Sequence, residues 1–173
     1  MRIERLGQHH ALNKFDCGVK ALNQWLINYA KENNRRDLSR TFVLIDDADD
    51  VVGFYSLTMG GVQVANLPRK LARGLPSVAI GMVLLGRLAL ASELQGQGFG
   101  RDLMVDAVLL ASAAGQNAAA RFIAVDPIDE SARGFYAAFG FLNIESDEMG
   151  RMYLRIDDAV AALSEANGVK GKK

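Results

Sequence analysis

The sequence has 173 residues, 50% of them hydrophobic, which suffices for one domain with a core and is too short for two domains of ordinary size. Twenty Lys and Arg residues balance 20 Asp and Glu residues, so no global charge attracts nucleic acid or an anionic membrane. The single Cys17 excludes an internal disulfide. His9 and His10 are adjacent and lack the spaced cysteines or acidic cluster of a metal site, so we expect no metal.

No segment has the length of a membrane span. The longest apolar stretch, residues 78–90, is interrupted by Arg87 and falls short of the roughly 20 residues that cross a bilayer. The sequence opens with Met-Arg-Ile-Glu-Arg and without the apolar segment of a secretory signal. We therefore expect a cytoplasmic protein.

The first half of the chain predicts a strand, a helix and a hairpin. Residues 2–6 form a short strand, and Asp16 offers an N-cap for a helix that runs to about residue 33. The apolar residues of this helix repeat at helical spacing, namely Val19, Leu22, Leu26 and Tyr29. Residues 40–45 and 51–64 form strands joined by an acidic turn. Residues 65–79 hold two prolines and three basic residues without a clear period, which predicts a mobile basic loop.

The second half alternates strands and helices. A strand at 81–90 leads through glycines into a helix that ends near residue 114. The inner stripe of this helix is Leu103, Ala107, Leu110, Ala111 and Ala114. We then expect a strand at residues 121–125 and a helix at 129–139 that Gly140 ends. An antiparallel pair of strands follows at 141–144 and 149–156. The chain closes with a helix at 157–166 and a disordered basic tail at 168–173. This order predicts an α/β fold.

The glycine segment Gln95-Gly-Gln-Gly-Phe-Gly-Arg101 stands where a strand passes into a helix. Glycines let the backbone turn tightly and approach a ligand, and their N–H groups converge on an anion. The positive end of the helix dipole adds to this attraction. The segment therefore predicts a loop that binds phosphate, and its alternative is a plain strand-to-helix turn.

Spacing separates three kinds of phosphate loop. A dinucleotide loop needs a third glycine at position 101, where Arg101 stands, and a Walker loop needs a lysine that the segment lacks. The spacing that remains, as the third kind of phosphate loop, is Gln95-x-x-Gly98-x-Gly100. One strand later the chain reads Ala132-Arg-Gly-Phe-Tyr-Ala-Ala-Phe-Gly-Phe141, whose aromatic residues, taken alone, are typical of a core.

These two segments, at this spacing, resemble the GNAT acetyltransferases. Further segments resemble the GNAT toxins of type II toxin-antitoxin modules, which acetylate the α-amine of aminoacyl-tRNA and inhibit translation. The resemblance covers about residues 12–156. Its additional segments are Phe15-Asp-Cys-Gly18, Leu22-Asn-Gln-Trp-Leu26, Ser39-Arg-Thr-Phe-Val43, Val52-Gly-Phe-Tyr-Ser-Leu57 and Leu85-Gly-Arg-Leu-Ala89.

The resemblance implies an acyl-CoA N-acyltransferase fold, with a mixed central sheet, flanking helices and a splayed strand pair at the cofactor site. Residues 1–160 would form a single domain, and residues 161–173 a helix end and a flexible basic tail. It also implies acetyl-CoA as donor, aminoacyl-tRNA as acceptor, a homodimer and a small ribbon-helix-helix antitoxin as partner.

The resemblance also implies roles for individual residues. Tyr136 would donate a proton to the leaving thiolate. The residues that would bind the cofactor are Leu88, Ala89, Leu90, Gln95, Gly96, Gln97, Gly98, Phe99, Gly100, Arg101, Asp129 and Phe135. Two positions depart from the common pattern, because Asp129 stands where general GNATs often have an asparagine and Ala91 where an acidic residue is frequent.

An α-amine is the acceptor that the chemistry favours. Its pKa of about 7.7–8.0 leaves a usable neutral fraction, whereas a lysine amine near 10.4 demands a base that no spacing reveals. For RNA, the candidate basic residues are Arg35, Arg36, Arg40, Arg69, Lys70, Arg73 and Arg87, and ordinary surface ion pairs are the alternative. Two other functions stay open: acetylation of a small amine or protein N-terminus, and a cofactor-binding interaction module without activity.

Overall fold

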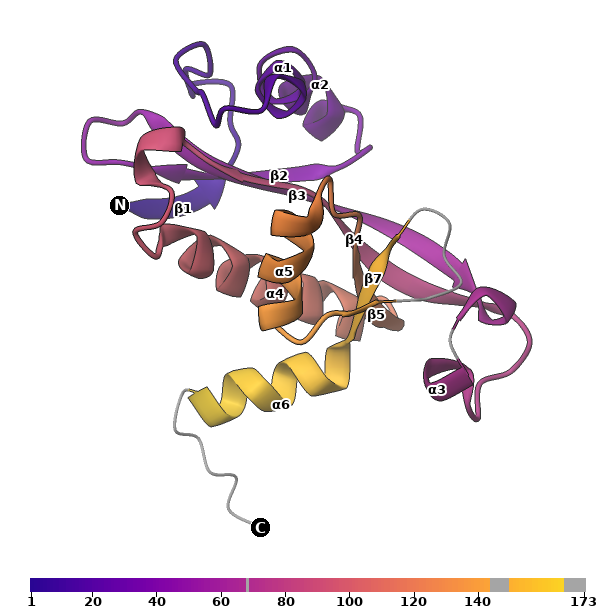
Figure 1. Cartoon of the computed structure of the whole chain (residues 1–173). Coiled ribbons are helices and arrows are strands. Elements are labelled where there is room, and N and C mark those ends of the chain that lie inside the picture. Colours follow the sequence, from indigo (N-terminus) through magenta and orange to yellow (C-terminus); the bar gives the residue numbers. More distant parts are fainter. Residues whose placement is uncertain (68, 144–149, 167–173) are drawn as a thin grey trace. The chain divides into compact units, whose positions relative to one another are not determined.

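The computed structural model describes residues 1–67, 69–143 and 150–166. Contacts within the chain define two compact units, Met1–Thr58 with Leu85–Ala107 and Met59–Leu84 with Val108–Lys173. Three elements, labelled in Figure 1, run through both units: β3 (Val51–Gln63), β4 (Ala79–Leu90) and α4 (Phe99–Asn117).

In the first unit, three strands form an antiparallel meander. β1 (Arg2–Arg5) pairs with β2 (Arg40–Ile45), and β2 pairs with the first half of β3. The predicted strands are therefore confirmed to within a residue or so. In the turn between β2 and β3, the Asp46 carboxylate accepts hydrogen bonds at 2.9 Å from the N–H groups of Ala48 and Asp50. The acidic turn is thus ordered by its own aspartate.

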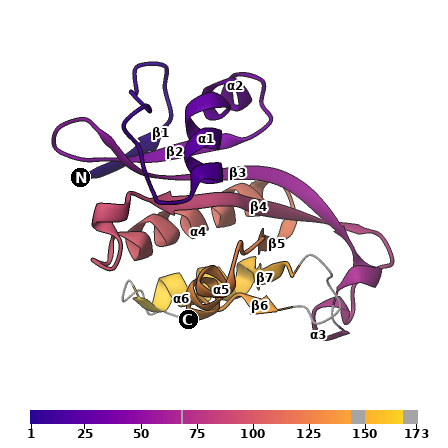
Figure 2. The same cartoon turned by 45° about the horizontal axis from the view of Figure 1, so that its top comes forward.

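The helix predicted after Asp16 is divided and begins later than expected. α1 (Lys20–Asn28) follows an N-cap at Val19, and α2 (Ala30–Arg35) starts after Tyr29, whose φ of −124° interrupts the helix. Because of this break, Tyr29 is 57% exposed and does not lie on the inner face. Figure 2 shows both helices beside β2 and β3, and their buried residues are Trp25, Leu26 and Ala30.

Asp16 orders a turn and caps no helix. Its carboxylate accepts hydrogen bonds from the Gly18 N–H at 2.8 Å and from the Asn23 side-chain amide at 2.7 Å. Both bonds hold its pKa below its usual range. An aspartate three or four residues before a helix can satisfy the preceding turn just as well, which is why sequence placed the cap too early.

Aromatic rings and one buried polar pair hold the first unit together. Phe54 of β3 stacks on Trp25 of α1, with ring centroids 5.9 Å apart, and Phe42 of β2 stacks on Tyr55 at 5.1 Å. The hydroxyl of Tyr55, which is fully buried, donates to the Asp106 carboxylate of α4 at 2.5 Å. Burial and this carboxylate together raise the pKa of Tyr55. The pair ties β3 to the first half of α4.

α4 buries a wider stripe than predicted. Leu103, Ala107 and Ala111 are buried as expected, whereas Leu110 and Ala114 are only half-buried. The remaining buried residues of the helix are Met104, Val108, Ser112 and Gly115. The helix runs to Asn117, three residues beyond the predicted end, and Ala119 follows at a φ of 55°.

In the second unit, residues 65–79 are partly helical, so the prediction of a mobile loop is wrong for this segment. A 3-10 helix η1 (Val64–Asn66) is followed by α3 (Arg69–Ala72). Leu67 and Leu71 are buried in a cluster with Phe122 and Tyr153. The prolines and basic residues of this segment obscure its two buried leucines, of which Leu67 is extended and Leu71 lies in α3.

The rest of the second unit agrees closely with prediction. β5 (Ala120–Val125) pairs antiparallel with β7 (Met152–Arg155), which also pairs with β6 (Leu142–Asn143). α5 (Glu130–Ala138) precedes Gly140, whose φ is 86°, and α6 (Ile156–Ala166) follows β7 directly. The predicted strand ends at Ile144 and Met149 and the predicted tail at 168–173 lie outside the described residues.

Hydrogen bonds order the seven strands as β1-β2-β3-β4-β5-β7-β6. β4 and β5 are neighbours joined by the long helix α4, a connection that suits parallel strands, whereas the pairs described above are antiparallel. The predicted α/β architecture with a mixed sheet is therefore confirmed. Within the described ranges, no helix is long and apolar enough to cross a membrane.

Tyr55→Phe tests the buried polar pair. The variant removes the only hydroxyl that the structure places on the Asp106 carboxylate among the described residues, and we expect the free energy of unfolding to fall by about 1–3 kcal/mol, measured by urea denaturation. Tyr29→Phe, at an exposed tyrosine, is the matched control and should change little. Adding Asp106→Asn should recover part of the loss. A Tyr55→Phe protein as stable as the wild type would contradict this account.

Candidate functional site

The glycine loop follows the end of β4. After Leu90 the chain makes a 3-10 turn, η2 (Ser92–Leu94), and the loop then delivers residue 99 to the first turn of α4. Gly96 and Gly98 have φ values of 77° and 96°, in the region that favours glycine. A Cβ at either position would meet no atom within 4 Å. These glycines are therefore needed for backbone conformation and for open space above the loop, and not for packing within the protein.

The loop presents backbone donors that the described protein leaves unused. Within residues 1–67, 69–143 and 150–166, the N–H groups from Gly96 to Gly100 donate to no protein acceptor, and the first bonded one is Arg101, to the Gly98 carbonyl at 2.9 Å. The loop also leads into the N-terminus of a 19-residue helix. Unsatisfied N–H groups with a helix dipole behind them bind anions, and a pyrophosphate fits this set of donors.

Gln95 has a structural role that sequence did not reveal. Its side-chain amide donates to the Leu90 carbonyl at 2.9 Å and to the Cys17 carbonyl at 3.1 Å. Gln97 likewise donates to the Glu93 carbonyl at 2.6 Å. Two of the residues predicted to contact the cofactor thus use their amide nitrogens to fix the shape of the loop against the end of β4.

The end of β4 carries Leu88, Ala89 and Leu90, of which the last two are buried. One residue earlier, the Arg87 guanidinium lies over the Trp25 ring, 4.2 Å from the centroid, which is a cation–π contact. Burial lowers the pKa of Arg87. No carboxylate of the described chain pairs with it, so its edge donors are available to a ligand. Sequence predicted Arg87 only as a candidate to bind RNA and did not identify Trp25.

In the second unit, α5 carries Asp129, Phe135 and Tyr136. The Asp129 carboxylate accepts the Ala132 N–H at 2.7 Å as an N-cap, so it begins the helix at the predicted residue. Tyr136 is only 8% exposed, and its ring contacts Phe135 and Phe141 with centroids 5.6 and 5.9 Å away. Within the described residues its hydroxyl forms no hydrogen bond with the protein.

The second unit also contains an ion pair that sequence did not single out. Arg151 donates from Nε and Nη2 to the two oxygens of Asp126, at 2.6 and 2.7 Å. Burial, and then the charge of Asp126, raise the pKa of Tyr136 to about 12. Tyr136 therefore keeps its proton throughout the neutral range, as a proton donor must.

Some of the basic residues proposed to bind RNA form ion pairs with described carboxylates, and the others do not. Arg35 donates to Glu32 at 2.6 and 2.8 Å, and Arg40 pairs with Asp37. The others are exposed and form no ion pair with the described residues: Arg36, Arg69, Lys70 and Arg73. The first unit holds the residues of α2 and β2, and the second holds those of α3 and the turn after it. Local carboxylates thus already neutralise part of the predicted basic set.

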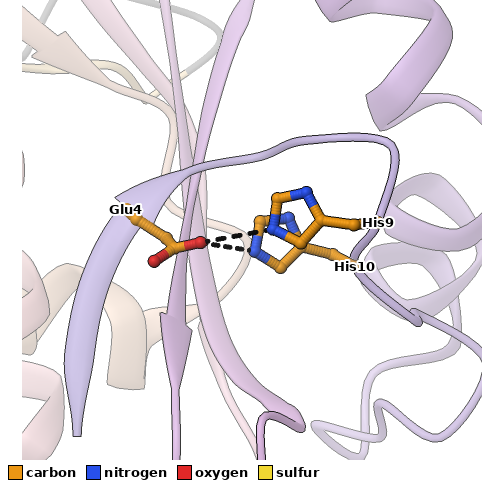
Figure 3. A group of neighbouring side chains, drawn as sticks. All are labelled: Glu4, His9 and His10. Atoms are coloured by element: carbon orange, nitrogen blue, oxygen red, sulfur yellow. Dashed lines mark hydrogen bonds and ion pairs between the residues drawn. The ribbon is translucent and has the colours of Figure 1, made fainter.

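Glu4, His9 and His10 come together although sequence predicted no metal cluster (Figure 3). Their ligand atoms lie within 4.8 Å of one another, because β1 brings Glu4 beside the loop of the histidines. However, His10 Nδ1 accepts the Gly7 N–H at 2.8 Å, so its single proton lies on Nε2 and is donated to Glu4 at 2.9 Å. A metal on Nε2 would need that position deprotonated. These hydrogen bonds therefore hold the loop that contains the two histidines against β1.

Gly98→Ala tests the backbone of the glycine loop. The added Cβ meets no neighbour, so its whole effect is the strain of a positive φ, and we expect a loss of about 1 kcal/mol in the free energy of unfolding. Gly134→Ala is the matched control, because it adds a Cβ in open space within α5 and should stabilise the protein by up to about 1 kcal/mol. Equal shifts in melting temperature for the two variants would rule out the conformational role.

Three comparisons with known proteins agree with this geometry. Residues 37–142 match the acetyltransferase (GNAT) domain. The chain is 33% identical over 161 residues to the tRNA-acetylating toxin of Mycobacterium tuberculosis (strain ATCC 25618 / H37Rv), covering 93% of this chain and 95% of the relative.

Two solved structures have the same fold. AtaT complexed with acetyl-methionyl-tRNAfMet has a TM-score of 0.86 at 27% identity, over 94% of this chain and 98% of that one. AtaTR bound with AcCoA has a TM-score of 0.82 at 28% identity, over 94% and 97%. The family model covers more than half of the chain, and the relative covers nearly all of it. The chain therefore belongs to the GNAT family of acetyltransferases and has the GNAT fold.

Proposed function

We infer that this protein transfers an acetyl group from acetyl-CoA to the α-amine of aminoacyl-tRNA and that it is the toxin of a type II toxin-antitoxin module. The observation that carries this conclusion is the 33% identity to a tRNA-acetylating toxin over nearly the full length of both chains. Acetylation removes the nucleophilic amine that peptide synthesis requires, so the expected consequence is inhibition of translation.

The glycine loop supports acetyl-CoA as donor. The free N–H groups from Gly96 to Gly100 and the N-terminus of α4 would hold the pyrophosphate, and the backbone of Leu88, Ala89 and Leu90 would bind the pantetheine arm in the manner of an added strand. Phe99, Arg101, Asp129 and Phe135 complete the proposed cofactor set. When bound, acetyl-CoA supplies an activated acetyl thioester.

Tyr136 is the proposed acid. As the neutral amine attacks the thioester carbon and the carbon–sulfur bond breaks, the phenol donates its proton to the departing sulfur. The nitrogen loses one proton to solvent as the amide forms, and the phenolate regains a proton from solvent after the products leave. The reaction requires the protonated phenol, and burial keeps Tyr136 in that form. A general acid contributes about 10²–10⁴ in rate.

The acceptor needs no strong base if it is an α-amine. An amine with a pKa of about 7.7–8.0 is partly neutral at pH 7, and the ester of an aminoacyl-tRNA lowers this value further. The chain therefore has only to bind and orient the acceptor, and its unpaired basic residues provide the means. We propose that Arg87, with its free donors beside Trp25, contacts RNA phosphate together with exposed basic residues such as Arg36 and Arg69.

The proposal also covers the partners of this protein and the compartment in which it acts. We propose a homodimer, a small ribbon-helix-helix antitoxin that blocks the active site, and action in the cytoplasm, where charged tRNA is found. We also propose that residues 1–160 act as one domain. Each of these follows from the likeness to GNAT toxins and awaits its own test.

Incubation with acetyl-CoA and a set of charged tRNAs tests the function. We expect N-acetyl-aminoacyl-tRNA, detected by mass spectrometry after nuclease digestion, and equimolar release of CoA thiol. Tyr136→Phe removes the phenol hydroxyl that would donate the proton. It should lower the single-turnover rate by a factor of about 10²–10⁴ and leave the affinity for acetyl-CoA unchanged.

Tyr29→Phe is the control, because Tyr29 is exposed and lies outside the proposed site. If folded wild-type protein acetylates no charged tRNA but acetylates a small amine or a protein N-terminus, the acceptor assignment is wrong. If it releases no thiol with any acceptor, the protein is a binding module and the enzyme assignment fails.

Arg87→Gln tests the RNA contact. We expect the KM for aminoacyl-tRNA to rise about tenfold and the slope of log affinity against log salt to fall by about one, since one phosphate contact is lost. Arg35→Gln is the matched control, because Glu32 already pairs with Arg35, and it should change both quantities little. Acetyl-CoA affinity checks that the Arg87 variant is folded. An unchanged salt slope would remove Arg87 from the RNA-binding set.

A further inference from the structure

A turn ahead of α1, at residues 16–18, contacts the segment that leads into the glycine loop. The Asp16 carbonyl accepts hydrogen bonds from the Ser92 N–H at 2.9 Å and from the Ser92 hydroxyl at 3.3 Å. The Cys17 carbonyl accepts a third from the Gln95 side-chain amide at 3.1 Å. These bonds join parts of the chain that are 76 to 78 residues apart in sequence. The turn at residues 16–18 is therefore a direct neighbour of the loop.

The side chain of Asn23, near the start of α1, fixes the shape of this turn. Its Nδ2 donates to the Asp16 carboxylate at 2.7 Å, and its Oδ1 accepts the Cys17 N–H at 3.0 Å. A carboxylate can only accept and a backbone N–H can only donate, so these two contacts define which end of the amide is which. The Cys17 thiol also donates to Oδ1 at 3.0 Å. Both ends of the Asn23 amide are thus used, and a carboxylate at this position would lose the donor.

The glycine loop is open, so hydrogen bonds at its start must hold its shape. Residues 95–98 are exposed, and a Cβ at Gly96 or Gly98 would meet no atom within 4 Å. The Gln95 amide lies between the carbonyls of Cys17 and Leu90 and bonds to both. Donors that are ordered before a ligand arrives bind it more tightly, because less conformational entropy is lost on binding. A shift of the turn would remove one of the two bonds that order Gln95.

We propose that Asn23 is a positioning residue for the pyrophosphate of acetyl-CoA. It fixes the turn at residues 16–18, and this turn holds Ser92 and Gln95 at the start of the loop. The free N–H groups from Gly96 to Gly100 are then ordered before the ligand binds. This inference rests on the proposed role of the loop in binding acetyl-CoA. Because Asn23 acts through the turn and Gln95, its effect is confined to the part of the donor that the loop binds.

Three thioesters that differ in their phosphates test this role. Acetyl-CoA and its 3′-dephospho form both contain the pyrophosphate, whereas S-acetyl-pantetheine contains no phosphate. Asn23→Asp keeps the shape of the side chain but places a second carboxylate against Asp16. We expect the Kd of both pyrophosphate donors, measured by calorimetry, to rise about tenfold, the effect of one lost hydrogen bond to a charged group. The Kd of S-acetyl-pantetheine, measured by ligand-observed NMR, should stay unchanged.

Two variants separate hydrogen bonding from charge. Gln24→Glu is the matched control, because it adds a negative charge at the next, exposed position of α1, and it should leave all three Kd values nearly unchanged. Combining Asn23→Asp with Asp16→Asn exchanges donor and acceptor at the net charge of the wild type. This double variant should return the Kd of acetyl-CoA to within about threefold of the wild-type value.

Ser92→Ala tests the same contact from the loop side and serves if Asn23→Asp does not fold. It removes one of the three bonds to the turn. We expect the Kd of the two pyrophosphate donors to rise about twofold and that of S-acetyl-pantetheine to stay unchanged. An unchanged Kd for all three donors in this variant would count against the proposal.

Equal losses for all three donors in Asn23→Asp would overturn the proposal, because Asn23 would then support the fold as a whole. A Kd for acetyl-CoA that stays at the wild-type value, or a double variant that does not recover, would overturn it as well. The measurement needs no acceptor, so it decides the role of Asn23 even if aminoacyl-tRNA is not acetylated. A wild-type protein that binds no acetyl-CoA would instead remove the proposed role of the loop, and the role of Asn23 with it.

Discussion

Backbone N–H groups that the protein does not satisfy are the constraint on which the chemistry of this chain depends. A folded chain normally pairs its polar backbone groups, so consecutive free donors from Gly96 to Gly100 require an external acceptor or solvent. Two left-handed glycines create this state, and Gln95 fixes it by bonding to carbonyls on either side of the loop. If these N–H groups were bonded within the protein, the loop could no longer bind an anion through them.

Each of the two units contains groups with a proposed role. The first provides anion-binding donors at the end of β4 and a half-buried arginine on Trp25. The second provides a phenol kept neutral by burial on α5. Neither contribution requires an unusual residue type. Each results from where an ordinary group is placed: the amides lie in an exposed loop that a ligand can reach, and the phenol is buried.

Sequence predicted the strands, the loop and α5 well because their signals are local. The acidic turn separates β2 from β3, glycines mark the loop, and Asp129 with Gly140 marks both ends of α5. Prediction from sequence failed where one residue can form two different local structures. Asp16 can cap a helix or a turn, and its hydrogen bonds to Gly18 and Asn23 order the turn.

Side-chain pairs distant in sequence were also beyond its reach. Asp126 and Arg151 are separated by 25 residues, and only the register of β5 against β7 makes them neighbours. The stacking of Arg87 on Trp25 and the gathering of Glu4 with two histidines depend on tertiary packing in the same way. Sequence named Arg87 as an arginine within an apolar stretch and as a candidate to bind RNA. It could not identify Trp25, the ring over which Arg87 lies.

The register of β5 and β7 has a consequence for how this protein tolerates change. Because the Asp126–Arg151 pair extends the ladder by one step, deleting a single residue from β7 would move Arg151 to the opposite face of the strand. Such a deletion would separate Arg151 from Asp126 without changing either residue. The length of β7 therefore determines whether this ion pair can form.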